Sequence, residues 1–85
     1  MTQKEITAAK KKAKEYLELF GIKVPMTKMN ILFCYIDTNR FLITFYDVRT
    51  ADLIQCQYAN NRYTVYKHIN STGNTVVFKK EKNND

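Results

Sequence analysis

The chain has 85 residues and a mass of 10.0 kDa, which limits it to one small domain of about two packed layers. Hydrophobic residues make up 45% of the sequence and aromatic residues 13%, enough for a folded core, so the composition excludes an intrinsically disordered chain. The net charge of +6 makes polyanions the expected partners, and no apolar run approaches the roughly 20 residues that a membrane span requires.

Most of the positive charge lies near the N-terminus. Residues 1–28 carry seven lysines and three glutamates, a net charge of +4, whereas residues 29–69 and 70–85 each carry +1. The N-terminal residues follow a lysine-rich helical pattern without the apolar region of a secretory signal. We therefore expect a single domain over residues 1–85 that is cytoplasmic and has no membrane partner.

A helix is predicted over residues 3–20. Thr2 followed by Glu5 matches a capping box at its start. Gly21 can supply the left-handed residue that ends a helix, and Pro25 prevents a restart. Apolar side chains recur within an arc of about 100°, the width of a core-facing stripe: Ile6, Ala9, Ala13, Tyr16, Leu17 and Phe20.

Residues 30–79 predict a five-stranded antiparallel meander, because runs of β-branched and aromatic residues alternate with short polar turns. The expected turns are Thr38-Asn39, Asp47 to Asp52, Asn60-Asn61 and Ser71 to Asn74. The last strand is expected at residues 75–79. The basic tail at residues 80–85 has no apolar pattern and should fray.

One register carried through the four turns divides the strand side chains between two faces. Face one is almost purely apolar, and we expect the helix to cover it: Leu32, Cys34, Ile36, Phe41, Ile43, Phe45, Ile54, Cys56, Val65, Ile69, Val76 and Phe78. Cys34 and Cys56 both pair with Ile43, which separates them by about 9.6 Å, whereas a disulfide requires about 7 Å or less. The prediction is an α+β two-layer fold with two free, buried thiols.

Face two is the side of the sheet that the helix does not cover, and it carries Ile31, Phe33, Tyr35, Leu42, Thr44, Tyr46, Leu53, Gln55, Gln57, Thr64, Tyr66, His68, Val77 and Lys79. Its first two strands are apolar and aromatic, and an exposed area of that kind indicates an interface. The alternative is that strong sheet curl hides Ile31, Phe33 and Leu42 within a half-closed barrel.

The aromatic side chains of face two are the candidate binding site, because flat rings on a sheet stack single-stranded bases while glutamines read base edges. The candidate residues are Phe33, Tyr35, Tyr46, Gln55, Gln57, Tyr66, His68 and Lys79, with a basic margin of Lys10, Lys11, Lys14 and Lys80. Tyrosine is also an ordinary strand residue. The helix lysines also form i,i+4 pairs with Glu15 and Glu18, which is typical of a solvated helix surface.

We therefore expect a small non-enzymatic binding module whose partner is single-stranded nucleic acid. The alternative is an accessory or inhibitor protein of phage or mobile-element type, docking on a larger nucleic-acid-handling protein. The inference of a phage or mobile-element origin is based only on the small size, the Lys- and Asn-rich composition and the absence of a cofactor motif. A further alternative is that two copies of the chain form a homodimer through face two.

An enzymatic alternative is a small ribonuclease toxin, which this chain resembles in size and charge but not in any motif. His68 would move the proton and Lys79 would hold a phosphate, with Tyr66 and Arg62 nearby. A lone histidine on a sheet is more often an exposed strand residue, so we expect no catalytic residues. We also expect no cofactor and no metal, because the aspartates belong to turns and one histidine with two buried cysteines does not make a zinc site.

Overall fold

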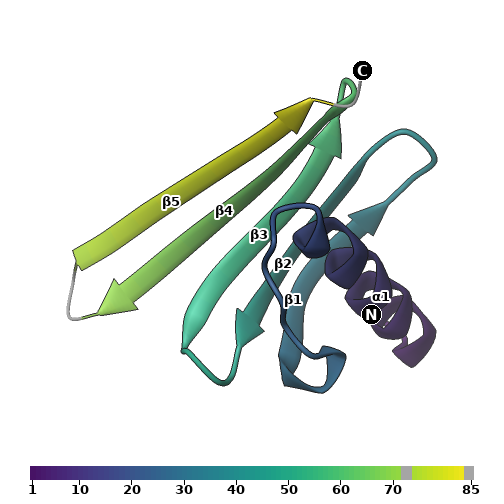
Figure 1. The fold of residues 1–85 in the computed structure, drawn as a ribbon. Coiled ribbons are helices and arrows are strands. Elements are labelled where there is room, and N and C mark those ends of the chain that lie inside the picture. The colour runs from purple at the N-terminus through teal and green to yellow at the C-terminus, as the bar shows by residue number, and fades with distance from the viewer. Residues whose placement is uncertain (72–73, 84–85) are drawn as a thin grey trace.

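In a computed structural model of the chain, one helix packs on one face of a five-stranded antiparallel sheet, which is the predicted α+β two-layer fold (Figure 1). The structure describes the backbone of residues 1–71 and 74–83, and the side chains of residues 1–68 and 80–83. The strand order is β1-β2-β3-β4-β5, a meander. The elements are α1 (Gln3–Glu18), the 3-10 turn η1 (Met26–Lys28), β1 (Met29–Ile36), β2 (Phe41–Asp47), β3 (Asp52–Ala59), β4 (Arg62–Ser71) and β5 (Asn74–Asn83).

Both ends of α1 follow the sequence signals. The Glu5 amide donates to Thr2 Oγ1 at 3.1 Å, and the Thr2 amide donates to Glu5 Oε1 at 3.4 Å, which completes the capping box. At the other end Gly21 has a φ of +73°, and the Ile22 amide donates to the Leu17 carbonyl at 3.0 Å. The helix ends at Glu18, two residues before the predicted end. No helix in the described part of the chain is long and apolar enough to cross a lipid bilayer.

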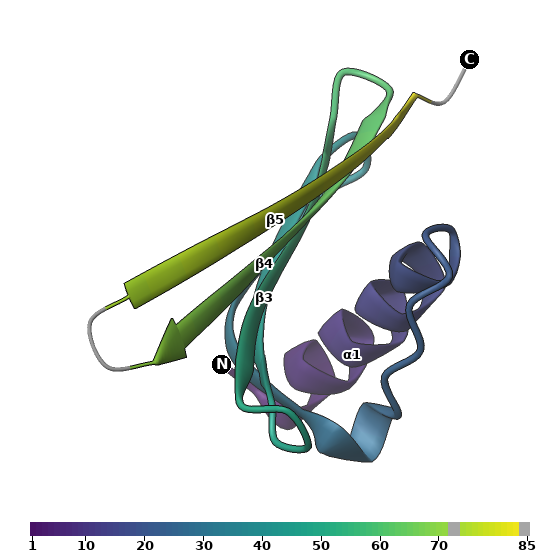
Figure 2. The ribbon, with the colours of Figure 1, turned by 60° about the vertical axis from the view of Figure 1, so that its left-hand side comes forward.

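The helix covers face one, as predicted (Figure 2). Ala9, Ala13 and Leu17 are fully buried against the sheet, and the two alanines bring the helix backbone close to the strands. Near its C-terminal end, the Tyr16 ring stacks on Phe41 with centroids 4.2 Å apart. Stacked rings of this kind contribute beyond the area that they bury. The core is therefore apolar under the middle of α1 and aromatic at one end.

From Phe33 on β1 onward, the sheet follows the predicted register. The confirmed pairs are Ile36–Phe41, Cys34–Ile43, Phe45–Ile54, Ile43–Cys56, Tyr58–Tyr63, Cys56–Val65 and Ile69–Val76. Asn60 and Asn61 have φ values of +53° and +62°, as the predicted type I′ turn requires. The fourth turn, at Thr72 and Gly73, lies outside the described residues.

The register prediction is wrong in the first half of β1. A bulge at Leu32 shifts the pairing, so that Ile31 rather than Leu32 faces Phe45. Ile31 is buried on face one, whereas Leu32 is 53% exposed. A bulge adds one residue to one strand of a pair. Here it allows Ile31 and Met29 to reach the core without moving the pairs further along β1.

The prediction that residues 80–85 fray is wrong for residues 80–83. β5 continues to Asn83, which pairs with Arg62, and the Arg62 Nε donates to Asn83 Oδ1 at 3.2 Å. Strand pairing depends on backbone hydrogen bonds, so a polar strand can form wherever a neighbouring strand offers a free edge. β4 begins at Arg62 and supplies that edge. Residues 84 and 85 lie outside the described part.

Both cysteines are free, as predicted, but they differ in burial. Cys56 is buried, and burial raises the pKa of its thiol to about 12. Cys34 is only partly buried, because it lies near the edge of the sheet, where its Sγ is 3.4 Å from the sulfur of Met1. The prediction of two buried thiols therefore holds for Cys56 alone.

Candidate functional site

Face two is uncovered: no element formed by residues 1–71 and 74–83 lies over it (Figure 2). On β1, Phe33 is 51% exposed and Tyr35 is 45% exposed, and on β2 Tyr46 is 36% exposed. This exposure contradicts the half-closed barrel for Phe33, while Ile31 is buried on the other face. Three aromatic rings therefore meet solvent on one side of two neighbouring strands.

The polar half of face two spans β3 and β4. Gln55 donates through its amide nitrogen to Thr44 Oγ1 at 3.2 Å, which fixes one of the two candidate glutamines on the sheet. Gln57 is half-buried and lies beside Thr64, its partner on β4. Thr64 was expected to be exposed with the rest of this face, but it is buried. Of the two glutamines, Gln57 is therefore the better placed to contact a ligand.

The residues of the catalytic alternative lie in one part of the sheet. Tyr66 pairs with Lys79, as predicted, and His68 pairs with Leu53 and Val77. Tyr66 and His68 are half-buried, and the side chain of Lys79 lies outside the described part. Among the residues that the structure describes, no three His, Cys, Asp or Glu side chains are grouped to hold a metal ion.

A hollow of about 440 Å³ lies on face two, at the sheet end that carries the β1–β2 turn. It is lined by Tyr35, Arg40, Phe41, Leu42, Gln57, Tyr58 and Ala59. The Arg40 guanidinium carbon lies 5.8 Å from the centre of the Tyr35 ring, within the range of a cation–π contact. Arg40 Nη2 is also 3.4 Å from the Tyr35 hydroxyl, and that hydroxyl is 3.4 Å from Asp37 Oδ2. A flat ring and a cation thus lie together at the rim of the hollow.

A second hollow of about 330 Å³ adjoins the first, because both are lined by Gln57 and Ala59. Arg62 and Thr64 line it from β4, and Glu81 lines it from β5. The two hollows form a track from Tyr35 on β1 to Arg62 on β4. At about 4.8 Å per strand, the track is roughly 14 Å long.

The predicted basic margin does not border face two. Lys10, Lys11 and Lys14 belong to α1, which lies on the other side of the sheet. Lys80 pairs with the buried Val65 and lines a cleft on face one. Among the side chains that the structure describes, the cations that line the track are instead Arg40 and Arg62. The sequence pattern does not single out Arg40, because a residue next to a turn carries no periodic signal.

Comparison of the chain with protein-family models, with curated proteins and with solved structures finds no match.

Proposed function

We propose that this protein is a non-enzymatic binding module that holds single-stranded nucleic acid on face two. The observation that carries the proposal is the track of two adjoining hollows, with the Tyr35 ring and Arg40 at one end and Arg62 at the other. Proteins that bind single strands combine aromatic stacking platforms with cations that follow the phosphates.

The chemistry of the track suits one strand rather than a duplex. Tyr35 at the end of the track, and Phe33 two residues before it on β1, present exposed rings on which bases of any sequence can stack. Gln57, between the hollows, carries an amide that can both donate to and accept from a base edge. Arg40 and Arg62 can pair with phosphates, and the net charge of +6 attracts the polyanion over a longer range.

Fluorescence anisotropy with a labelled 12-nucleotide single-stranded DNA and its RNA equivalent tests the proposal. Binding should weaken steeply with salt, because each neutralised phosphate of a single strand adds about 0.7 to the slope of log K against log salt. The double variant Arg40→Gln/Arg62→Gln should lower that slope by about 1.4. The matched control Lys11→Gln/Lys14→Gln removes the same charge from the helix layer and should leave the slope unchanged. Equal losses in both variants would mean that net charge alone attracts the strand.

A second candidate function is docking on another protein in an accessory role, and one observation favours it. β1 is an edge strand without a charged residue, and Leu32, Phe33 and Ile36 on it are exposed. Exposed apolar groups of this kind are typical of protein interfaces. Association that resists both nuclease treatment and moderate salt, and that is lost in Leu32→Ser, would favour this function over the first.

A further inference from the structure

A cleft of about 450 Å³ lies on face one, and no residue of α1 lines it. Ile22 and Val24, from the segment after α1, form one wall, and Ile54 and Val65 come from the sheet. The other lining residues are polar or charged: Asp47, Arg49, Thr50, Asp52, Lys67 and Lys80. The cleft therefore combines an apolar surface with a group of polar side chains, on the opposite side of the sheet from the track.

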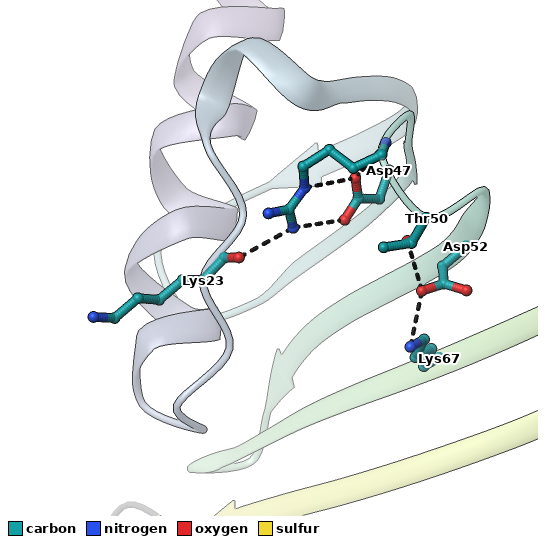
Figure 3. A network of polar contacts seen from close by, with 6 residues as sticks. Lys23, Asp47, Thr50, Asp52 and Lys67 are labelled. Carbon is teal, nitrogen blue, oxygen red and sulfur yellow. Dashed lines mark hydrogen bonds and ion pairs between the residues drawn. The ribbon is translucent and has the colours of Figure 1, made fainter.

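Both carboxylates of the cleft are nearly fully buried, and each has a cation as its partner (Figure 3). Asp47, 2% exposed, accepts from Arg49 Nη2 at 2.9 Å and from Arg49 Nε at 3.2 Å. Asp52, 5% exposed, accepts from Thr50 Oγ1 at 2.7 Å and from Lys67 Nζ at 2.8 Å. These four charges cancel in two pairs, so together they favour neither an anion nor a cation.

The other contacts of the cations do not change this balance. Arg49 also donates to the Lys23 carbonyl at 3.1 Å, which ties the β2–β3 turn to the segment after α1 (Figure 3). Lys80 is exposed and already has an interaction partner, and an exposed charge contributes little to binding. The cleft therefore gives an ion of either sign no strong counter-charge.

An ion that entered the cleft would compete with the existing pairs. A carboxylate would compete with Asp52 for Lys67, and an ammonium group would compete with Lys67 for Asp52. Weakening the pair of a nearly fully buried carboxylate is costly. An uncharged oxygen avoids this cost, because the Lys67 ammonium group has three donors and is partly exposed, so it can donate a second hydrogen bond while it stays on Asp52.

We propose that this cleft binds a small uncharged molecule with an aliphatic body and one hydroxyl or carbonyl oxygen. The aliphatic body lies against Ile22, Ile54 and Val65, and the oxygen accepts a hydrogen bond from Lys67. Ligand sites are typically hollows of about 300–1,000 Å³ with apolar walls and a few convergent polar groups, and this cleft matches that description. The site is separate from the track on face two and does not depend on nucleic-acid binding.

Three probes with the same alkyl chain test the proposal: octanol, octanoate and octylammonium, each titrated at pH 7 into the ¹⁵N-labelled protein. We expect octanol to shift the amide signals of residues 22–24, 54, 65 and 67. Both ions should bind there about tenfold more weakly, because each loses hydration without gaining a free counter-charge. Binding of either ion as tight as that of octanol would overturn the ligand class. Octanol shifts that are absent, or that spread over face two, would overturn the site.

A first variant tests the apolar contacts. Ile22→Trp should weaken octanol binding about tenfold, because the larger side chain takes the space of about two methylene groups of the probe. The matched control is Leu32→Trp, which adds the same side chain at an exposed position of β1 outside the cleft and should leave octanol affinity unchanged. Thermal unfolding shows whether each variant folds. Full octanol affinity in folded Ile22→Trp would contradict the proposal.

A second variant tests the charge argument. Lys67→Met removes the cation from Asp52, so octylammonium should bind about fivefold more tightly than to the parent protein, as expected for one gained ion pair. Octanol should bind more weakly, since its oxygen loses the Lys67 donor. The control Lys11→Met removes the same charge from α1 and should change neither affinity. Unchanged affinities for both probes in folded Lys67→Met would contradict the role of the Asp52–Lys67 pair in selecting an uncharged molecule.

Discussion

Each face of the sheet carries a group of aromatic side chains, and the two groups differ in their surroundings. On face one, Phe41 stacks on Tyr16 of the helix and is almost fully buried. On face two, Phe33 and Tyr35 have no layer above them among the described residues and are about half exposed. The same residue types are therefore core on one face and surface on the other, and the position of the helix makes the difference.

Phenylalanine occurs on both faces, which allows a matched test of the comparison. Phe41→Ala should lower the free energy of unfolding by about 3–5 kcal/mol, because it removes a buried ring and leaves a cavity. Phe33→Ala should lower it by less than about 1 kcal/mol, since that ring is half exposed. Urea unfolding followed by circular dichroism measures both. Similar losses in the two variants would mean that face two belongs to the core.

The ion pair between Lys67 and the buried Asp52 on face one should contribute to the stability of the fold. Lys67→Met should lower the free energy of unfolding by about 1–2 kcal/mol, because it leaves the buried Asp52 carboxylate with Thr50 as its remaining side-chain partner. The expected value lies between those of exposed and buried pairs, since Lys67 is partly exposed. The exposed Lys11→Met is the control and should change stability by less than about 0.5 kcal/mol. Equal stability of the two variants would show that the Asp52 pair contributes nothing.

A smaller effect should appear in the pH dependence of stability. The hydrogen bonds and charge of Arg49 hold the pKa of the Asp47 carboxyl below its ordinary value, which is about 4. A lowered folded pKa contributes stability that is fully present above the unfolded pKa and is lost as the pH falls through the folded pKa. Arg49→Gln should therefore be less stable than the parent at pH 6 and should approach it below pH 3. A difference that stays constant from pH 6 to pH 2 would contradict this linkage.

A small stability change together with a large effect on binding is expected at Tyr35. Tyr35→Ala removes a ring that is 45% exposed, so unfolding should change by less than about 1 kcal/mol. Its affinity for a single-stranded oligonucleotide should fall by about 1–3 kcal/mol, the contribution of one stacked base. Anisotropy titration and thermal unfolding of the same samples separate the two effects. Retained affinity would remove Tyr35 from the site.

The sequence signals that proved reliable are local and chemically specific. Thr2 with Glu5 and Gly21 mark the helix ends, and Asn60-Asn61 marks a turn that sets the register of two strands. Local signals do not show which side chains at the start of β1 face the helix. Ile31, Leu32 and Phe33 are three consecutive apolar residues, so an alternation of apolar and polar side chains cannot be read there.

Other features depend on the three-dimensional arrangement alone. Lys80 to Asn83 pair with β4 through the backbone, which leaves no pattern in the side chains. The assignment of the helix lysines to the margin of face two was wrong, because packing of the helix on face one, which the sequence did predict, places them in the other layer. The position of Arg40 beside the first hollow and the cleft on face one both depend on how the turns and the segment after α1 fold, which the sequence does not show.

Mapping a bound strand by NMR tests the central claim most directly. A 12-nucleotide single strand added to the ¹⁵N-labelled protein should shift the signals of Phe33, Tyr35, Arg40, Gln57 and Arg62, including the Gln57 side-chain amide. Signals from α1 residues 10–14 should change little. Shifts confined to α1, or no shifts at low salt, would contradict the assignment of face two as a nucleic-acid-binding surface.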